Sequence, residues 1–211
     1  MDDKELWEEC LKLIPNGTMT YSKCPNRYVD GVYPKFLIRG EGCYLYDREE
    51  KKYVDYIASL GAIILGYSNR FINNKVKRNI DFGQVLVSLA NPLELMLAKQ
   101  LNKYIKCAEK VKYFKTGSEA CSAAIKVARA YTSRESILVC GYHGWHDWYT
   151  VSTDKKLGIP GRLSLNVFKF KYNDLEDLER GLKRGDIAAV IMEPVVYEEP
   201  KDNYLEEVRN L

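Results

Sequence analysis

The residues best suited to chemistry in this sequence are Thr116, Gly117 and Ser118, which stand between a strand-like run at 111–114 and a helical pattern. The first N–H groups of a helix lack internal partners and carry the positive end of its dipole, so they favour an anion such as phosphate. Gly117 would let a ligand approach the backbone, and the two hydroxyls could donate hydrogen bonds. These residues therefore predict a phosphate site. The alternative is that Ser118 only caps a helix whose dipole Glu119 complements.

A segment rich in aromatic and histidine side chains lies at 142–148, after another apolar run. Its His143 and His146 are the only histidines of the chain. A metal site would need further ligands at a suitable spacing, and none is evident, so we predict no metal. The cysteines include no C-x-x-C pair, which predicts free, reduced thiols. They stand at positions 10, 24, 43, 107, 121 and 140.

The elements that must position these groups alternate between helices and apolar strands. After the helix that follows the turn at 116–118, short apolar runs and one further helical pattern follow. This alternation predicts an α/β fold with a mostly parallel sheet built from βαβ crossovers. The predicted strands are 136–140, 167–170 and 187–192, with a helix at 174–183. Glu193 follows the last strand, at the end where such sheets bind ligands, although it could also be an ordinary loop carboxylate.

The helix after the turn at 116–118 is expected to bury one side. The residues of that face recur with helical spacing; they are Ala120, Ala124, Val127, Ala128 and Tyr131.

The first part of the chain shows different patterns. An amphipathic helix is predicted at 3–14, and an irregular segment at 18–33 follows it. Three short β-like pieces predict a β-meander; they are 36–39, 43–47 and 52–56. We therefore divide the chain into an N-terminal helix-plus-meander segment, 1–57, and the first part of a large α/β domain, 58–211.

Two more helices are predicted in the second of these segments. The first covers 71–82, with Val76 and Ile80 facing inward, and the second covers 92–105. An apolar run at 85–89 leads into the second helix.

The composition excludes several classes of protein. The 211 residues carry a net charge of +3 with both signs interleaved, which is not the footprint of a nucleic-acid-binding surface. No apolar run approaches the length of a membrane span. The N-terminus lacks the basic-then-apolar order of a signal peptide, so we expect a cytoplasmic protein with neither nucleic-acid nor membrane partners.

Several motifs resemble those of a known family, the class III, fold type I aminotransferases that depend on pyridoxal phosphate (PLP). Within that family, the chain resembles the glutamate-1-semialdehyde aminomutase branch. The matching residues are Thr116-Gly117-Ser118-Glu119-Ala120, Ala128-Arg129-Ala130-Tyr131-Thr132, Tyr142-His143-Gly144, Tyr172-Asn173-Asp174 and Glu193-Pro194-Val195.

The resemblance implies PLP as the cofactor and assigns residues to it. The segment 116–118 would hold the phosphate, Tyr142 would stack on the ring, His143 would lie beside the ring, and Glu193 would lie near the cofactor. Tyr142 could instead be an ordinary core tyrosine. The resemblance further implies a homodimer, in which the loop 88–91 approaches the neighbouring subunit's site.

The resemblance covers only about the first half of a full-length family member. In the family, the aspartate at the pyridine nitrogen and the Schiff-base lysine come later, so no catalytic residue is expected in this chain. Either the chain is a truncated fragment, or a second polypeptide supplies the C-terminal half. The 211 residues alone should then be inactive.

The expected function is that of an aminotransferase or aminomutase acting on a small amino acid or amino-aldehyde. The alternatives are a non-catalytic PLP-binding module and a partner subunit of a lysine-bearing paralogue.

Overall fold

The computed structural model describes residues 1–211 except 25–26, 30, 85–86 and 196. Parts of the predicted irregular segment 18–33 and of the apolar run 85–89 therefore lie outside the described residues. The chain forms two compact units, Met1–Leu97 and Ala98–Leu211, whose boundary falls within helix α3 (Pro92–Tyr104). The division into 1–57 and 58–211 stays a prediction.

The first unit contains the predicted N-terminal helix and meander. Helix α1 (Asp3–Leu13) begins at a capping box between Asp2 and Glu5. Short 3₁₀ turns follow it at Pro15–Gly17 and Tyr21–Lys23. The antiparallel meander is confirmed; its strands are β1 (Leu37–Glu41), β2 (Tyr44–Asp47) and β3 (Lys52–Val54).

Helix α2 (Arg70–Asp81) also forms as predicted, and the side chain of Asn69 caps it. The expectation that Val76 and Ile80 face inward is wrong, because they are 50% and 58% exposed. No residue of α2 is buried. An apolar face needs a second layer to bury it, and a helical pattern in the sequence does not supply that layer.

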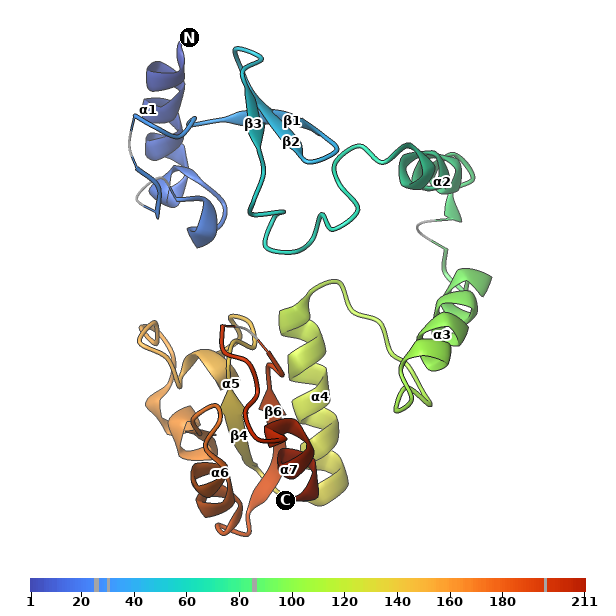
Figure 1. Ribbon diagram of the computed structural model, residues 1–211, viewed down its shortest axis with the longest axis vertical. Coiled ribbons are helices and arrows are strands. Elements are labelled where there is room, and N and C mark those ends of the chain that lie inside the picture. The colour runs from blue at the N-terminus through green and yellow to red at the C-terminus, as the bar shows by residue number, and fades with distance from the viewer. Residues whose placement is uncertain (25–26, 30, 85–86, 196) are drawn as a thin grey trace. The chain divides into compact units, whose positions relative to one another are not determined.

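The second unit is an α/β layer structure, as predicted (Figure 1). Its parallel sheet has the order β5-β4-β6, with β4 in the centre. The strands are β4 (Ser136–Cys140), β5 (Val167–Lys169) and β6 (Ile187–Met192). The helices are α4 (Gly117–Thr132), α5 (Asp147–Thr150), α6 (Leu175–Leu182) and α7 (Tyr204–Asn210), with a 3₁₀ segment at Gly161–Asn166.

The core of this unit lies on both faces of β4. Side chains alternate along a strand, so Ile137 and Val139 pack with Ile125 of α4, whereas Leu138 packs with Leu178 of α6. Ile137, Leu138 and Val139 are at most 1% exposed. In Figure 1, α4 and α6 accordingly flank the sheet on opposite sides. This burial fixes the carboxyl end of β4, from which the loop at 141–146 departs.

Two predictions about the neighbourhood of α4 are wrong. The run 111–114 is irregular and not a strand, and it pairs with none of β4, β5 and β6. A strand needs another strand beside it to take its backbone hydrogen bonds, and the sheets of the described residues do not include this run.

The buried face of α4 is also not the predicted one. Val127 and Tyr131 are 68% and 91% exposed, whereas the buried residues are Ser118 and Ile125. Small apolar residues occur on more than one side of α4, so its sequence is compatible with either of two faces being buried. The sheet takes the face that carries the β-branched Ile125.

Candidate functional site

The N-terminal turn of α4 keeps two backbone donors free. Thr116 caps the helix: its hydroxyl accepts from the N–H of Glu119 at 3.2 Å, and the Glu119 carboxylate accepts from the N–H groups of Thr116 and Lys115, each at 3.0 Å. Among the described residues, the N–H groups of Gly117 and Ser118 have no acceptor. A Cβ added to Gly117 would meet nothing within 4 Å, so the approach is open. The alternative in which Ser118 caps the helix is therefore wrong, and the turn suits an anion.

The loop after β4 lies directly on this turn. Ser118 is buried, and its hydroxyl accepts from the N–H of Trp145 at 3.2 Å. A Cβ on Gly144 would lie 2.2 Å from the Ser118 Oγ and 2.8 Å from its Cα, so only glycine allows this approach. Residues distant in the sequence thus meet at one end of α4.

The topology of the sheet explains why a site can form here. The chain passes from β4 to β5 on one side and then to β6 on the other side of β4. Connections that leave in opposite directions open a crevice at the carboxyl ends of the two strands, and α/β proteins bind ligands at such switch points. The loops that follow β4 and β6 leave the sheet at this end.

Glu193 joins these two loops. Its N–H donates to the carbonyl of Cys140 at 3.1 Å, and its carboxylate accepts from the N–H of Tyr142 at 2.7 Å. A Cβ on Gly141 would lie 2.5 Å from that carboxylate, so the loop passes close to it. Glu193 therefore links the loop after β6 to the loop that bears Tyr142, and its place near the cofactor stays a prediction.

His143 is buried behind the loop, with 4% of its surface exposed. Its Nε2 lies 3.0 Å from the carbonyl oxygen of Cys140. Because a carbonyl only accepts, Nε2 carries the proton of the neutral ring. Burial lowers the pKa of His143, and the Cys140 carbonyl and Glu193 act in the opposite direction. The imidazole is neutral at physiological pH.

Tyr142 is 65% exposed, so its ring is available to a ligand and the alternative of a core tyrosine is wrong. The buried Tyr149 packs against the Tyr142 ring edge to face: the two rings are perpendicular, with centroids 5.9 Å apart. The Tyr149 hydroxyl donates to the carbonyl of Gly141 at 2.8 Å, and burial raises its pKa. A neutral tyrosine thus holds the start of the loop.

The predicted site residues lie in one unit. The segment 116–118, Tyr142, His143 and Glu193 occupy the start of α4 and the carboxyl ends of β4 and β6. Roles for Tyr149 and Ser122 were not apparent from the sequence. The one available signal for Ser122 was its position four residues after Ser118, which places both hydroxyls on the same helical face.

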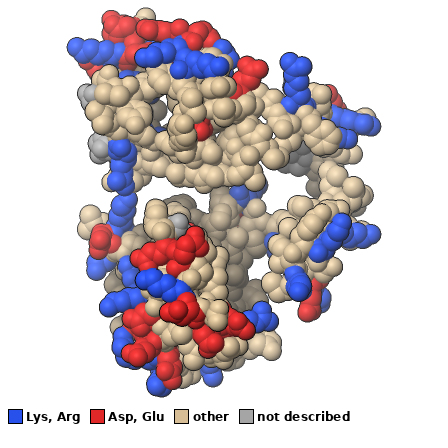
Figure 2. All heavy atoms as spheres, viewed as in Figure 1, with Lys and Arg blue, Asp and Glu red and all other residues tan. Residues whose placement is uncertain are grey.

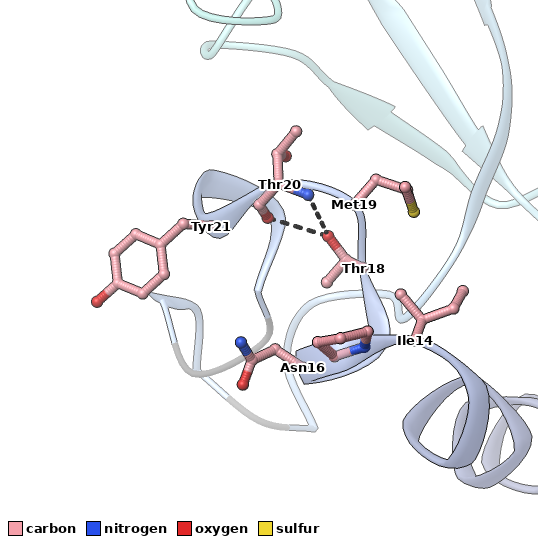
Figure 3. A pocket seen from close by; sticks show the side chains of 7 residues that line it. Ile14, Asn16, Thr18, Met19, Thr20 and Tyr21 are labelled. Atoms are coloured by element: carbon pink, nitrogen blue, oxygen red, sulfur yellow. Dashed lines mark hydrogen bonds between the residues drawn. The ribbon is translucent and has the colours of Figure 1, made fainter. Parts of the chain in front are cut away.

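A separate hollow of about 320 Å³ lies in the first unit and is lined by residues 14–16 and 18–21 (Figure 3). Its Thr18 hydroxyl donates to the Thr20 carbonyl at 3.0 Å and accepts from the Thr20 N–H. None of the predicted site residues line it.

The charged surface, the potential metal ligands and the helices have one notable feature each. On the face shown in Figure 2, basic and acidic side chains lie side by side within each unit. Over the described residues, no three His, Cys, Asp or Glu side chains gather as metal ligands, and no helix is long and apolar enough to span a membrane.

A helix N-terminus at the switch point of a parallel sheet is the arrangement with which α/β proteins bind phosphorylated ligands. The particular family follows from comparison with known sequences. The profile of class-III aminotransferases matches residues 28–211, and the chain belongs to that family. The prediction of a fold type I, PLP-dependent relative is therefore confirmed, with PLP as the cofactor of the family.

Two curated relatives show the range of activities within the family. The chain is 36% identical to the 3-aminobutyryl-CoA aminotransferase of Cloacimonas acidaminovorans (strain Evry), covering 98% of this chain and 51% of the relative. It is 32% identical to the glutamate-1-semialdehyde 2,1-aminomutase of Methanothrix thermoacetophila, covering 99% of this chain and 51% of the relative. The chain thus spans about half the length of the curated relatives it matches.

Solved structures show the same fold. An omega-transaminase from Sphaerobacter thermophilus matches with a TM-score of 0.88 and 26% identity, covering 99% of this chain and 51% of that protein. A transaminase with PLP bound matches with a TM-score of 0.88 and 23% identity, covering all of this chain and 53% of that protein.

Proposed function

We propose that this chain forms the cofactor-binding N-terminal part of a PLP-dependent aminotransferase or aminomutase acting on a small amino acid or amino-aldehyde. The observation that carries the proposal is the pair of free N–H groups at Gly117 and Ser118, adjoining the loop that bears Tyr142, in a member of this family. The name of the aminomutase relative supports an amino-aldehyde as the substrate, whereas the name of the aminotransferase relative is that of an enzyme for an amino-bearing CoA thioester.

Each residue of the site has a role suited to its surroundings. The N–H groups of Gly117 and Ser118 bind the phosphate, and the Thr116 hydroxyl lies alongside them. The exposed ring of Tyr142 lies against the flat pyridine ring, a contact worth about 0.5–1.5 kcal/mol beyond its area. Neutral His143 and the carboxylate of Glu193 hold the loop from behind. The bound cofactor would supply an electron sink for chemistry at the substrate's amino-bearing carbon.

The remaining parts of the enzyme are proposed to lie outside these 211 residues. A lysine for the Schiff base and an aspartate for the pyridine nitrogen would come from further polypeptide, and the chain alone would bind the cofactor without turnover. We propose a cytoplasmic homodimer for the complete enzyme.

Binding of pyridoxamine 5'-phosphate tests the cofactor site. This ligand has the ring and phosphate of PLP but no aldehyde, so it cannot react with surface lysines. We expect saturable binding, detected as energy transfer from tryptophan to the ligand.

A matched pair of variants at Gly117 tests the phosphate position. Gly117→Glu places a carboxylate where the phosphate binds, at a helix start that tolerates acidic residues. With like charges about 4 Å apart, binding should weaken at least roughly tenfold, whereas neutral Gly117→Gln should bind more tightly than Gly117→Glu. Absence of binding by the unaltered protein, or equal binding by the two variants, would contradict the proposal.

A second measurement separates an enzyme from a binding module. Co-expression with a polypeptide that supplies the lysine and the aspartate should produce amino transfer. A complex that forms and binds the cofactor, yet never transfers an amino group, would identify a binding module or partner subunit instead.

A further inference from the structure

Ser122 connects α4 to the far end of the aromatic loop. Its Oγ accepts from the indole Nε1–H of Trp148 at 2.8 Å and lies 2.7 Å from Nδ1 of His146. Trp148 belongs to α5, and His146 is the N-cap position of that helix. One small hydroxyl therefore ties two side chains of the loop and the following helix to the second turn of α4.

The chemistry of the three groups defines how they are bonded. An indole N–H only donates, so Ser122 must accept from Trp148. Toward His146, the hydroxyl donates its single proton when Nδ1 is unprotonated, which leaves the ring proton of neutral His146 on Nε2. This arrangement uses the hydroxyl both as donor and as acceptor. Alanine at this position could make neither bond.

The contact lies one helical turn from the anion site. Ser118 and Ser122 are four residues apart and project from the same face of α4. Ser118 holds the loop at Gly144 and Trp145, and Ser122 holds it at His146 and Trp148. One point of attachment would let the loop pivot on the helix, whereas two points fix its position along the helix axis.

We propose that Ser122 is a positioning residue for the cofactor site. Through His146 and Trp148 it keeps the loop in register with α4, so that the ring of Tyr142 stays at a fixed position relative to the free N–H groups of Gly117 and Ser118. The inference rests on the proposed function. The inference concerns ligands that join a phosphate to a flat ring, because only such ligands must contact the free N–H groups and the Tyr142 ring at the same time.

Two ligands distinguish positioning from general support. Pyridoxamine 5'-phosphate needs both the N–H groups and the Tyr142 ring, whereas inorganic phosphate needs only the N–H groups. In Ser122→Ala, binding of pyridoxamine 5'-phosphate should weaken about five- to tenfold, as expected from the loss of partly buried hydrogen bonds. Inorganic phosphate, followed by ³¹P NMR line broadening, should bind as it does to the unaltered protein.

Two further variants complete the design. Ser122→Thr retains the hydroxyl and should restore binding of pyridoxamine 5'-phosphate. Ser133→Ala makes the same truncation as Ser122→Ala at the exposed C-terminal cap of α4, and it should change neither ligand's affinity.

The outcomes separate this inference from the proposed function. If the unaltered protein bound both ligands and Ser122→Ala bound them equally well, Ser122 would have no positioning role. Equal weakening of both ligands would show general structural support and also overturn the inference. If the unaltered protein bound neither ligand, the proposed function would fail, and this inference with it.

Discussion

Substitution of Gly144 by alanine should separate the loop from α4. Gly144 has φ +96°, a conformation that side-chain-bearing residues rarely adopt. Its new Cβ would lie 2.2 Å from the Oγ, 2.7 Å from the Cβ and 2.8 Å from the Cα of Ser118. A rotation of the Ser118 side chain could relieve only the first of these contacts. The other two require the loop or the helix to move.

The cost has two parts that another glycine can separate. The backbone conformation costs alanine roughly 1–2 kcal/mol, and overpacking adds about 1–3 kcal/mol. Gly158 has a comparable φ of +82°, but a Cβ there would meet nothing within 4 Å. Gly158→Ala therefore carries only the first cost, and Gly144→Ala should lose about 1–3 kcal/mol more free energy of unfolding.

Urea unfolding followed by circular dichroism measures this difference. Binding of pyridoxamine 5'-phosphate provides a second readout, because a displaced loop carries Tyr142 away from the free N–H groups. Gly144→Ala should bind this ligand more weakly than Gly158→Ala does. Equal loss of stability in the two variants would refute the close packing of Gly144 on Ser118.

Three further predictions concern single hydrogen-bonded groups. The Asp47 carboxylate accepts from the Tyr53 hydroxyl at 2.7 Å and raises the pKa of Tyr53 to about 12, so Asp47→Asn should return its ionisation toward 10 in an ultraviolet absorbance titration. Burial lowers the pKa of His143 below its ordinary 6.5. As the pH falls below about 6.5, His143 therefore takes up a proton in the unfolded chain before it does so in the folded chain. Stability should therefore fall as pH drops below about 6.5, and His143→Gln should flatten that fall in urea unfolding at several pH values. Glu119→Ala removes half of the capping box and should cost about 0.5–2 kcal/mol of unfolding free energy, whereas Glu119→Gln, which can still accept, should cost less.

The sheet of the second unit could be predicted because its strands are short, strongly apolar and separated by helical patterns. The core strand β4 is an example: its side chains are buried on both faces, which a continuous apolar run predicts. The starts of helices could be predicted equally well, because a helix cap is a local interaction. Asp174, for example, caps α6 through a bond to the N–H of Asp177. Signals of this kind depend on neighbours in the sequence.

Predictions that depended on distant neighbours were the ones that were wrong. The exposed side chain of Tyr131 shows that apolar spacing identifies a possible face of a helix but not the face that the sheet covers. The irregular run at 111–114 shows that β-like residues do not form a strand without a strand beside them. The family resemblance assigned the segment 116–118 and Tyr142 to one cofactor, but it did not predict the close approach of Gly144 to Ser118. No local pattern indicates a contact between a helix and a loop so far apart in the sequence.

The electrostatics of the site explain why such contacts matter. Two carboxylates lie there. Glu119 accepts from two backbone N–H groups and Glu193 from one, and these bonds offset part of each charge. His143 contributes no positive charge, because burial keeps its ring neutral. The attraction for an anion from these groups therefore comes from the oriented N–H groups at the start of α4, and such dipoles act only over a short range. Affinity then depends on alignment more than on net charge, so displacement of the loop should weaken binding even where every charged residue is retained.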